Sequence, residues 1–375
     1  MNILYVTTVG LTMRFFKHLI QDLIAEGHTV DLATNETDFC VPNCYRDWGC
    51  KVHPISCTRS PFDSGNLRAI KEIRAIVKEG KYDIVHCHTP IAAMCTRLAC
   101  QPFRKRGLRV IYTAHGFHFY KGAPLKNWLL YFPIEWICSF FTDTLITINR
   151  EDFAFSQKAL HARKNEYIPG VGIDVDKFAH TAVDRCAKRA ELGIPADCTL
   201  LASVGELNKN KNHEVVIRAL AALKDPSVHY LIVGKGELRE YLSQLADTLG
   251  LADQVHFGGF RSDIAEIYKA SDICVFPSIR EGLGLGAIEG MACGLPLIAS
   301  RNRGTTDYAQ NGENALLCKY DSVEDFCSAL RTLLNNPAMR ISMGNKNSIA
   351  AKHFDVLAIN MTMIHIYSKG SEDSL

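Results

Sequence analysis

The segment Ser271-Asp-Ile-Cys-Val-Phe-Pro-Ser-Ile-Arg-Glu-Gly-Leu-Gly-Leu-Gly-Ala-Ile-Glu-Gly-Met-Ala-Cys-Gly294 changes character twice. It begins as an apolar run typical of a buried parallel strand, passes through a glycine-rich turn, and continues from Ala287 with a helical pattern. Such a strand–turn–helix unit directs unpaired backbone N–H groups and the positive end of the helix toward one point. The segment therefore predicts an α/β domain with an anion-binding turn.

Two carboxylates bracket this turn. Glu281 is expected within the turn and Glu289 within the first turns of the helix. Each can accept hydrogen bonds from hydroxyl groups while a phosphate lies on the N–H groups between them, which together describe a nucleotide sugar. In the alternative interpretation Glu281 only caps the helix and Glu289 is solvated, and the motif alone does not decide because glycine turns are common.

A second loop points to the same edge of the sheet. Gly205 to His213 follows the apolar run 200–204 and places Lys209 and Lys211 where open α/β sheets bind their ligands. An ammonium group there would stabilise a departing diphosphate. The alternative is a solvated loop rich in Lys and Asn.

Short apolar runs alternate with helical patterns along the whole chain, which indicates parallel βαβ units. The pattern breaks at Pro and Gly near residues 167–172. We predict an N-terminal domain over 1–172, a second domain over 173–355, and a helical tail over 356–375 that returns toward the first domain and frays at its end. The expected strands are 3–7, 29–34, 84–86, 109–113 and 144–148, then 200–204, 230–233, 255–257, 273–276, 297–299 and 315–317, and the expected helices include 13–26, 213–223 and 238–249.

Charge and composition narrow the possible partners. The chain has 375 residues and a formal charge of +2, which gives no nucleic-acid signature. Residues 1–180 carry 22 Lys+Arg against 17 Asp+Glu, whereas the remainder carries 20 against 23. The basic first half fits either an ordinary solvated surface or contact with an anionic membrane. The start of the chain predicts no secretory signal, and no apolar run reaches the ~20 residues of a spanning helix.

No metal site is predicted. The 14 cysteines include no C-x-x-C pair, and we interpret Cys40, Cys44, Cys50 and Cys57, with His53 nearby, as reduced thiols rather than a zinc site. His86 and His88 fall on one face of a strand but lack an evident third ligand, so a structural or acceptor-side role is favoured. Asp174-Val-Asp176 lies at the domain crossing and is interpreted as structural.

The motif Ser-x-x-Glu-Gly-x-Gly-Leu-x-x-x-Glu-x-Met-Ala-Cys-Gly-x-Pro resembles the E-x7-E signature of the family 4 retaining glycosyltransferases. The resemblance implies the GT-B fold, an α/β architecture of two Rossmann-like domains facing each other across a cleft. Residues 112–124 and 204–211 resemble the subgroup encoded with bacterial capsule and exopolysaccharide assembly proteins. The similarity also covers the Gly10 loop and residues 83–88, 113–116, 169–178, 233–236 and 258–260.

The resemblance also implies roles for individual residues. The catalytic set would be His115, near the transferred sugar and acceptor, Lys211 on the diphosphate, and Glu281 on the sugar hydroxyls; His118 is a rival to His115. Many relatives carry Arg where this chain has Glu206, and Lys209 is a candidate substitute for the lost cation. The donor-binding set comprises Gly10, Glu206, Lys209, Gly234, Phe260, Arg261, Gly282, Leu283, Gly284, Leu285 and Glu289, with Glu289 on the ribose and the backbone around Phe260 on the base.

We expect a cytoplasmic, metal-independent enzyme without a cofactor. The resemblance implies that the anomeric configuration is retained, with the leaving diphosphate taking the proton of the acceptor. Donor and acceptor would be a UDP-sugar and a lipid-linked saccharide, and no nucleic acid is expected as a partner. Residues 127–141, with Trp128 and Trp136 and with Lys121 and Lys126 before them, fit either contact with the inner membrane face or core packing. The alternative functions are a non-hydrolysing UDP-sugar 2-epimerase and a catalytically inactive sugar-nucleotide sensor or scaffold.

Overall fold

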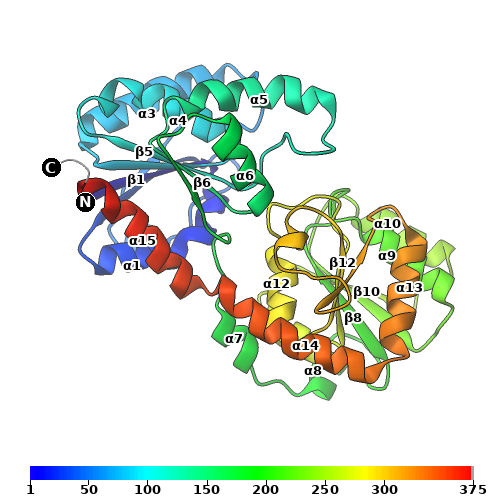
Figure 1. Ribbon diagram of the computed structural model, residues 1–375. Helices are drawn as coiled ribbons and strands as arrows, with labels where there is room; N and C mark the ends of the chain where they lie inside the picture. The colour runs from blue at the N-terminus through cyan, green and yellow to red at the C-terminus, as the bar shows by residue number, and fades with distance from the viewer. Residues whose placement is uncertain (373–375) are drawn as a thin grey trace. The chain divides into compact units, whose positions relative to one another are not determined.

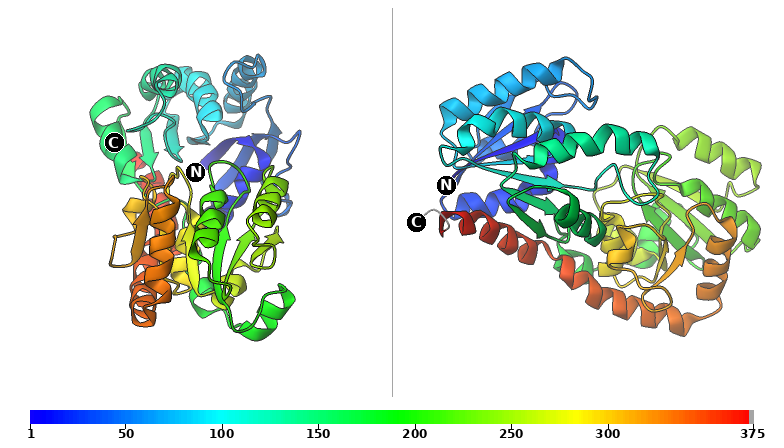
Figure 2. Two further views of the ribbon diagram at one scale, coloured as in Figure 1. Left: turned by 90° about the vertical axis from the view of Figure 1, so that its right-hand side faces the viewer. Right: turned by 45° about the horizontal axis from the view of Figure 1, so that its top comes forward.

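The computed structural model describes residues 1–372, and the chain divides into two compact α/β units (Figure 1). One unit comprises Met1–Val171 together with the C-terminal segment from Val356, and the other comprises Gly172–Asp355. Each is a parallel sheet with helices on both faces (Figures 1 and 2). The chain thus builds the same layered architecture twice, and each unit has its own core.

The first unit has a seven-stranded sheet in the order β3-β2-β1-β4-β5-β6-β7. Its successive strands run outward from β1 to β3, and the chain then returns to place β4 on the other side of β1. This reversal puts a topological switch point between β1 and β4. The strands are β1 (Asn2–Val9), β2 (Thr29–Asn35), β3 (Val52–Pro54), β4 (Ile84–His88), β5 (Arg109–Ala114), β6 (Thr144–Thr147) and β7 (Lys164–Tyr167). The helices are η1 (Gly10–Phe16), α1 (Lys17–Ala25), α2 (Cys44–Asp47), α3 (Gly65–Gly80), α4 (Pro90–Arg104), α5 (Leu125–Ser139), α6 (Arg150–Ala159) and α15 (Val356–Glu372).

The two edge strands of this sheet were not predicted. β3 has three residues and β7 has the polar sequence Lys-Asn-Glu-Tyr, and neither contains a fully buried residue. An edge strand pairs on one side only, so it needs no continuous apolar run. The expected helix 13–26 also differs, because residues 10–16 form a 3-10 helix and α1 begins at Lys17.

The last helix, α15, packs against α1 of the first unit. Asn360 donates a hydrogen bond from Nδ2 to Asp22 Oδ2 at 2.6 Å, and the Tyr367 hydroxyl is 2.6 Å from His86 Nδ1. Arg109 donates to the carbonyl oxygens of Ile366 and Tyr367 near the end of the helix. These contacts join the C-terminal helix to the strands of the first sheet. The predicted fraying at the very end concerns residues 373–375, which lie outside the described residues.

The second unit has a six-stranded sheet in the order β10-β9-β8-β11-β12-β13, with its switch point between β8 and β11. All six predicted strands are present. They are β8 (Thr199–Val204), β9 (Val228–Val233), β10 (Val255–Gly259), β11 (Ile273–Phe276), β12 (Leu297–Ser300) and β13 (Ala315–Cys318). The helices are α7 (Val175–His180), α8 (Arg185–Glu191), α9 (His213–Leu223), α10 (Arg239–Thr248), α11 (Ile264–Ala270), α12 (Leu285–Ala292), η2 (Thr305–Asp307), α13 (Val323–Leu334), α14 (Pro337–Ala351) and η3 (Lys352–Phe354).

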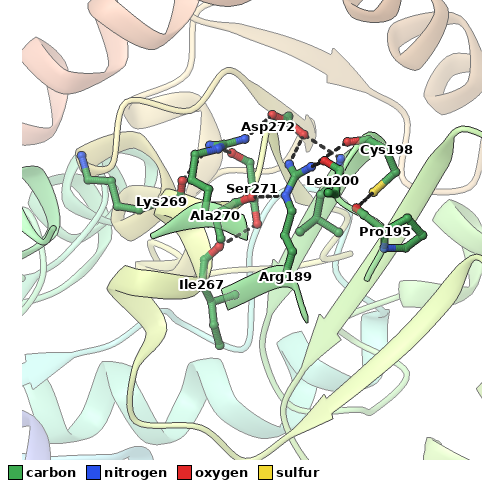
Figure 3. A network of polar contacts seen from close by, with 11 residues as sticks. Arg189, Pro195, Cys198, Leu200, Ile267, Lys269, Ala270, Ser271 and Asp272 are labelled. Atoms are coloured by element: carbon green, nitrogen blue, oxygen red, sulfur yellow. Dashed lines mark hydrogen bonds and ion pairs between the residues drawn. The ribbon is translucent and has the colours of Figure 1, made fainter. Parts of the chain in front are cut away.

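A polar network centred on the buried Arg189 fixes the amino-terminal edge of this second sheet (Figure 3). Asp272 precedes β11, and its carboxylate accepts hydrogen bonds from Arg185 and Arg189 of α8 and from the Leu200 N–H, at 2.7 to 2.8 Å. Arg189 also donates to the carbonyl oxygens of residues 196, 198 and 270. The network ties α8 to the starts of β8 and β11, at the edge opposite to the loops described next.

Candidate functional site

Two predicted residues, Lys211 and Glu281, meet at the switch point of the second sheet. Lys211 lies in the loop after β8 and Glu281 in the loop after β11, and these two strands are neighbours. Connections leave the two strands in opposite directions, so their loops leave room for a ligand at the carboxyl edge. Lys211 Nζ donates to Glu281 Oε1 at 2.6 Å, and both side chains are mostly buried. The structure thus brings together two side chains that are 70 residues apart in the sequence.

The Lys/Asn loop that carries Lys211 is held in its conformation by hydrogen bonds of its asparagine side chains and is not a loosely solvated segment. Asn208 Oδ1 accepts a hydrogen bond from the Lys211 N–H at 3.0 Å. Asn210 donates from Nδ2 to the Arg280 carbonyl at 2.9 Å, and its own carbonyl accepts from the Ile279 N–H at 2.8 Å. Asn212 has a left-handed φ of 54° and donates to the carbonyl oxygens of Pro277 and Tyr320. These bonds hold the Lys211 loop against the Glu281 loop.

The turn after β11 requires glycine at position 284 for steric reasons. Gly284 has φ +97°, and a Cβ there would lie 2.6 Å from the Phe276 ring. The same ring lies 5.2 Å from Lys211 Nζ, close enough for a cation–π contact. The turn therefore passes close to the aromatic face on which Lys211 rests.

Helix α12 starts at Leu285, two residues earlier than predicted, and its N-cap residue, Gly284, offers no side-chain cap. Among the predicted donor residues beside it, Gly282 is partly exposed and Leu283 is buried. The backbone N–H groups of an uncapped first turn attract an anion. An anion at this point would lie next to Lys211 and at the end of a turn that contains Glu281.

Glu289, in the second turn of α12, is a carboxyl group without a hydrogen-bonding partner among the described residues. Within residues 1–372 its carboxylate has no hydrogen bond or salt bridge, and its side chain is partly buried rather than solvated. Burial raises its pKa from the ordinary 4.5 to about 7, although the nearby positive charge of Lys177 acts in the opposite direction. Hydroxyl groups of a ligand could donate hydrogen bonds to this carboxylate and stabilise its charged form.

Four other predicted donor residues lie around these loops. Glu206 and Lys209 are exposed; Glu206 accepts a hydrogen bond from Asn208 Nδ2 at 3.0 Å, and Lys209 forms no ion pair with the described part of the chain. Gly234 allows the loop after β9 to approach the loop after β8, because a Cβ would lie 1.9 Å from the Gly205 carbonyl oxygen. The fourth, Phe260, is 66% exposed after β10.

Arg261, the residue after Phe260, is held by carboxylates. Its Nε donates to Asp263 Oδ1 at 2.8 Å, and its guanidinium also pairs with Glu191 of α8. Lys188 of α8 bonds the same two carboxylates. This ion network fixes the backbone of the loop that presents Phe260 and leaves the Arg261 side chain already engaged.

In the first unit, the predicted His115 follows β5 and is next to a second imidazole. His88 ends β4 and is buried, and its Nδ1 lies 3.1 Å from His115 Nε2. Burial lowers the pKa of His115 to about 4, and burial together with the neighbouring His86 lowers the pKa of His88 well below 6.5. Both imidazoles are therefore neutral at pH 7. The rival, His118, instead lies against Tyr131, with ring centroids 4.6 Å apart.

Gly10, the other predicted residue of the first unit, begins the 3-10 helix after β1 instead of an open loop. It is buried, and a Cβ there would lie 2.4 Å from the Phe39 carbonyl oxygen. Glycine is therefore required at position 10 because the backbone of residues 39–41 packs closely against it.

Several residues at these two switch points were missed in the sequence. Thr89 has φ +65°, a rare conformation for a β-branched residue, and its hydroxyl lies 2.7 Å from the Thr8 hydroxyl across the switch point of the first sheet. In the second unit, the hydroxyl groups of Ser278 and Tyr308 are buried and have no partner among the described residues. A Thr before a Pro at a strand end was the only available signal for Thr89.

The structure also bears on the metal motifs. No group of three or more His, Cys, Asp or Glu side chains in residues 1–372 is arranged to hold a metal ion. Both nitrogens of His86 are used by protein partners, Tyr367 and Thr113, which confirms a structural role for this residue. Asp174 caps α7 by accepting a hydrogen bond from the Lys177 N–H, which confirms its structural interpretation. None of the helices described up to residue 372 is both long and apolar enough to span a membrane.

Comparisons with known proteins agree with this geometry. Residues 2–149 match the family model described as glycosyl transferase 4-like, and residues 184–348 match the model described as glycosyl transferases group 1. The chain is 39% identical over 319 residues to EpsD of Bacillus subtilis (strain 168), whose assignment as a glycosyltransferase is provisional, with 84% of each chain covered.

Two more distant proteins extend the comparison. The UDP-Gal:alpha-D-GlcNAc-diphosphoundecaprenol alpha-1,3-galactosyltransferase of Escherichia coli is 29% identical over 306 residues, with 78% of each chain covered. The crystal structure of Anabaena HepE in complex with UDP superposes with a TM-score of 0.81 at 22% identity, covering 98% of this chain and 100% of the other. The chain therefore belongs to the group 1 glycosyltransferases of family 4, and its two parallel-sheet units are those of the GT-B fold.

Proposed function

We propose that this glycosyltransferase moves a sugar from a nucleoside-diphosphate sugar, a UDP-sugar, to a lipid-linked saccharide during exopolysaccharide or capsule assembly, with retention of the anomeric configuration. One observation carries the donor assignment. Lys211 and Glu281 are paired at the switch point of the second sheet, beside the uncapped start of α12. The choice of donor and acceptor is supported by the UDP bound in the HepE crystal structure and by the name of the Escherichia coli relative, which specifies UDP-Gal and diphosphoundecaprenol.

The pairing suggests how the donor would be received. Without a ligand, Lys211 and Glu281 neutralise each other. A diphosphate would attract the Lys211 ammonium and accept hydrogen bonds from the N–H groups of α12, which frees the Glu281 carboxylate to accept hydrogen bonds from the sugar hydroxyls. Glu289 would accept hydrogen bonds from the ribose. Lys211 and the helix start would then supply the charge neutralisation that the proposed metal-independent reaction requires.

The proposed reaction needs no dedicated carboxylate base. The bond from the anomeric carbon to the diphosphate oxygen breaks, the acceptor oxygen forms a bond to that carbon on the same face, and the leaving diphosphate takes the acceptor proton. Glu281, once the diphosphate has drawn Lys211 from the pair they form without a ligand, would hold the sugar in place by accepting hydrogen bonds from its hydroxyls. A 2-epimerase would instead require bases for proton abstraction from the sugar, and the described loops single out none.

The surface of α5 supports a proposed contact with the cytoplasmic face of the membrane. Trp128 and Phe132 pack against the core, so part of the helix is buried as the core-packing alternative expected. Leu125 and Leu129 are more than 70% exposed, and Trp136, Ile137 and Phe140 are exposed as well. Lys121, in the loop before the helix, and Lys126, in its first turn, are both exposed. Exposed aromatic and aliphatic side chains beside lysines suit an anionic membrane surface, where a lipid-linked acceptor resides.

The proposed function can be tested by incubating the full chain with radiolabelled UDP-sugars and membranes of a capsule-forming bacterium. Transfer of label into the lipid fraction, absent for the Lys211→Ala variant, supports a transferase. Inversion at C2 of the free donor would indicate an epimerase, and binding without turnover across a panel of donors would indicate a sensor. Either of these outcomes overturns the proposal.

A further inference from the structure

The imidazole pair at the end of β4 and β5 is asymmetric. His88 is 2% exposed, whereas His115 is only partly buried. His88 Nδ1 bonds His115 Nε2, while His88 Nε2 is buried and has no partner among the described residues. His115 Nδ1 likewise has no protein partner within residues 1–372. One nitrogen of His115 is thus occupied from inside the protein, and the other is left for a ligand.

Packing fixes the His88 ring. It lies between the rings of Phe16 and His86, with centroids 4.1 Å away in each case, and stacks on Tyr5 at 5.5 Å. His86 cannot turn to serve His88, because its two nitrogens bond Tyr367 and Thr113. Within the described chain, the only polar partner offered to the His88 side chain is therefore His115.

A saccharide cannot reach His88 directly. The neighbouring cavity in this unit is lined by His88 and His115 together with mostly apolar side chains, including Phe16, Ile168 and Met363. Its volume is about 20 Å³, which is room for roughly one water-sized group. Any influence of His88 on a saccharide must therefore pass through His115.

The position of the shared proton follows from the cost of a buried unpartnered group. Both rings are neutral at pH 7, so one proton lies between His88 Nδ1 and His115 Nε2. If His115 donated it, His88 would carry its own proton on the buried Nε2, leaving an orphaned N–H group. If His88 donates it, the buried Nε2 carries only a lone pair and no proton. This second arrangement is favoured, because buried N–H groups without an acceptor are rarer in proteins than buried acceptors without a donor.

We propose that His88 is a positioning residue that holds His115 in the tautomer with its proton on Nδ1, so that His115 presents a hydrogen-bond donor, and not a base, to a saccharide hydroxyl. The inference rests on the proposed function for the identity of the ligand, but the tautomer itself does not. His115 then orients the saccharide through its Nδ1–H. His88 fixes the orientation of this N–H group by its hydrogen bond to the other nitrogen of the His115 ring, as the hydrogen-bond partners of metal-ligating histidines do.

The test uses the full chain labelled with 15N at its histidine side chains, with the His115 signals assigned by a His115→Gln variant. In the wild type at pH 7.5, His115 is expected to carry its proton on Nδ1. His88→Asn places an amide donor where the Nδ1 of His88 was, so His115 should keep its proton on Nδ1. His88→Leu removes the donor, so His115 should instead carry its proton on Nε2. Tyr5→Phe is the matched control, because it removes a hydroxyl that contacts Tyr367 in the same aromatic cluster and spares the His88–His115 bond.

Kinetics provide the second readout. With a donor that supports transfer, His88→Leu should lower kcat roughly 10- to 100-fold, with little change in the donor KM. His88→Asn should recover most of that loss, and Tyr5→Phe should retain the wild-type kcat. A wild-type His115 with its proton on Nε2, or an unchanged tautomer in His88→Leu, would overturn the inference even if transfer is observed. Absence of transfer with every donor would refute the proposed function and leave the tautomer result standing.

Discussion

Replacing Glu289 by glutamine should make the protein more stable at alkaline pH while weakening nucleotide binding. The carboxyl group is partly buried without a partner among residues 1–372, and its pKa is raised from 4.5 to about 7. The unfolded chain releases this proton near pH 4.5, whereas the folded chain retains it up to about pH 7. Stability is therefore lost as the pH rises through this window, and the loss persists above it.

The size of the effect follows from the pKa. A rise from 4.5 to about 7, at 1.36 kcal/mol per pH unit, corresponds to about 3 kcal/mol as an upper figure, because the side chain keeps some solvent contact. Glutamine cannot ionise, so Glu289→Gln should match the wild type at pH 4.5 and exceed it by up to that amount at pH 8. The gain appears only when the ligand is absent, since ribose hydroxyls would otherwise bind the carboxylate.

The assay is urea unfolding of the full chain at pH 4.5, 6 and 8, followed by a probe of the second unit. Glu240→Gln, at an exposed carboxylate of α10 in the same unit, is the matched control for the loss of one charge. The same variants are then titrated with UDP, and Glu289→Gln should bind at least tenfold more weakly at pH 8, the loss expected of a hydrogen bond to a charged group. Parallel pH profiles for the wild type and Glu289→Gln would show that burial does not perturb this carboxyl group.

Three further predictions concern other parts of the molecule. Lys211→Ala should lower the rate of label transfer by roughly 100-fold or more while Lys224→Ala, at an exposed lysine that ends α9 in the same unit, changes it little; equal effects of the two would place the diphosphate elsewhere. Arg189→Leu should destabilise the second unit by roughly 1–3 kcal/mol in urea unfolding, because it leaves three carbonyl oxygens without their donor while Asp272 keeps Arg185 and the Leu200 N–H; an unchanged free energy of unfolding would contradict this role for the network in Figure 3. Leu129→Glu on α5 should reduce sedimentation with anionic vesicles without changing the affinity for UDP, and undiminished sedimentation would rule out α5 as the contact.

The two sheets and the centre of the donor site could be predicted from the sequence. Buried parallel strands are nearly continuous apolar runs, so β8 and β11 were recognisable, and each is followed by a chemically distinctive loop. Lys211 and Glu281 could therefore be placed at one edge before their contact was known. The edge strands β3 and β7 were not predicted because they are short and polar. A strand that pairs on only one side needs no continuous apolar run in its sequence.

Contacts between distant segments could not be predicted in the same way. Tyr367 lies 281 residues from His86, and nothing in its helical surroundings specifies that its hydroxyl meets an imidazole in β4. The bond between His88 and His115 likewise depends on the register of two strands and on ring orientation. Apolar and turn patterns fix elements and their order, whereas tertiary packing fixes which polar atoms meet.

The proposed function depends above all on the place of the donor diphosphate, in the loops after β8 and β11. Hydrogen exchange of the full chain, with and without a nucleoside diphosphate that raises its unfolding temperature, tests this location directly. We expect ligand-dependent protection of backbone amides in residues 205–212 and 278–286. A nucleotide that stabilises the protein but leaves both segments unprotected would show that the diphosphate binds elsewhere.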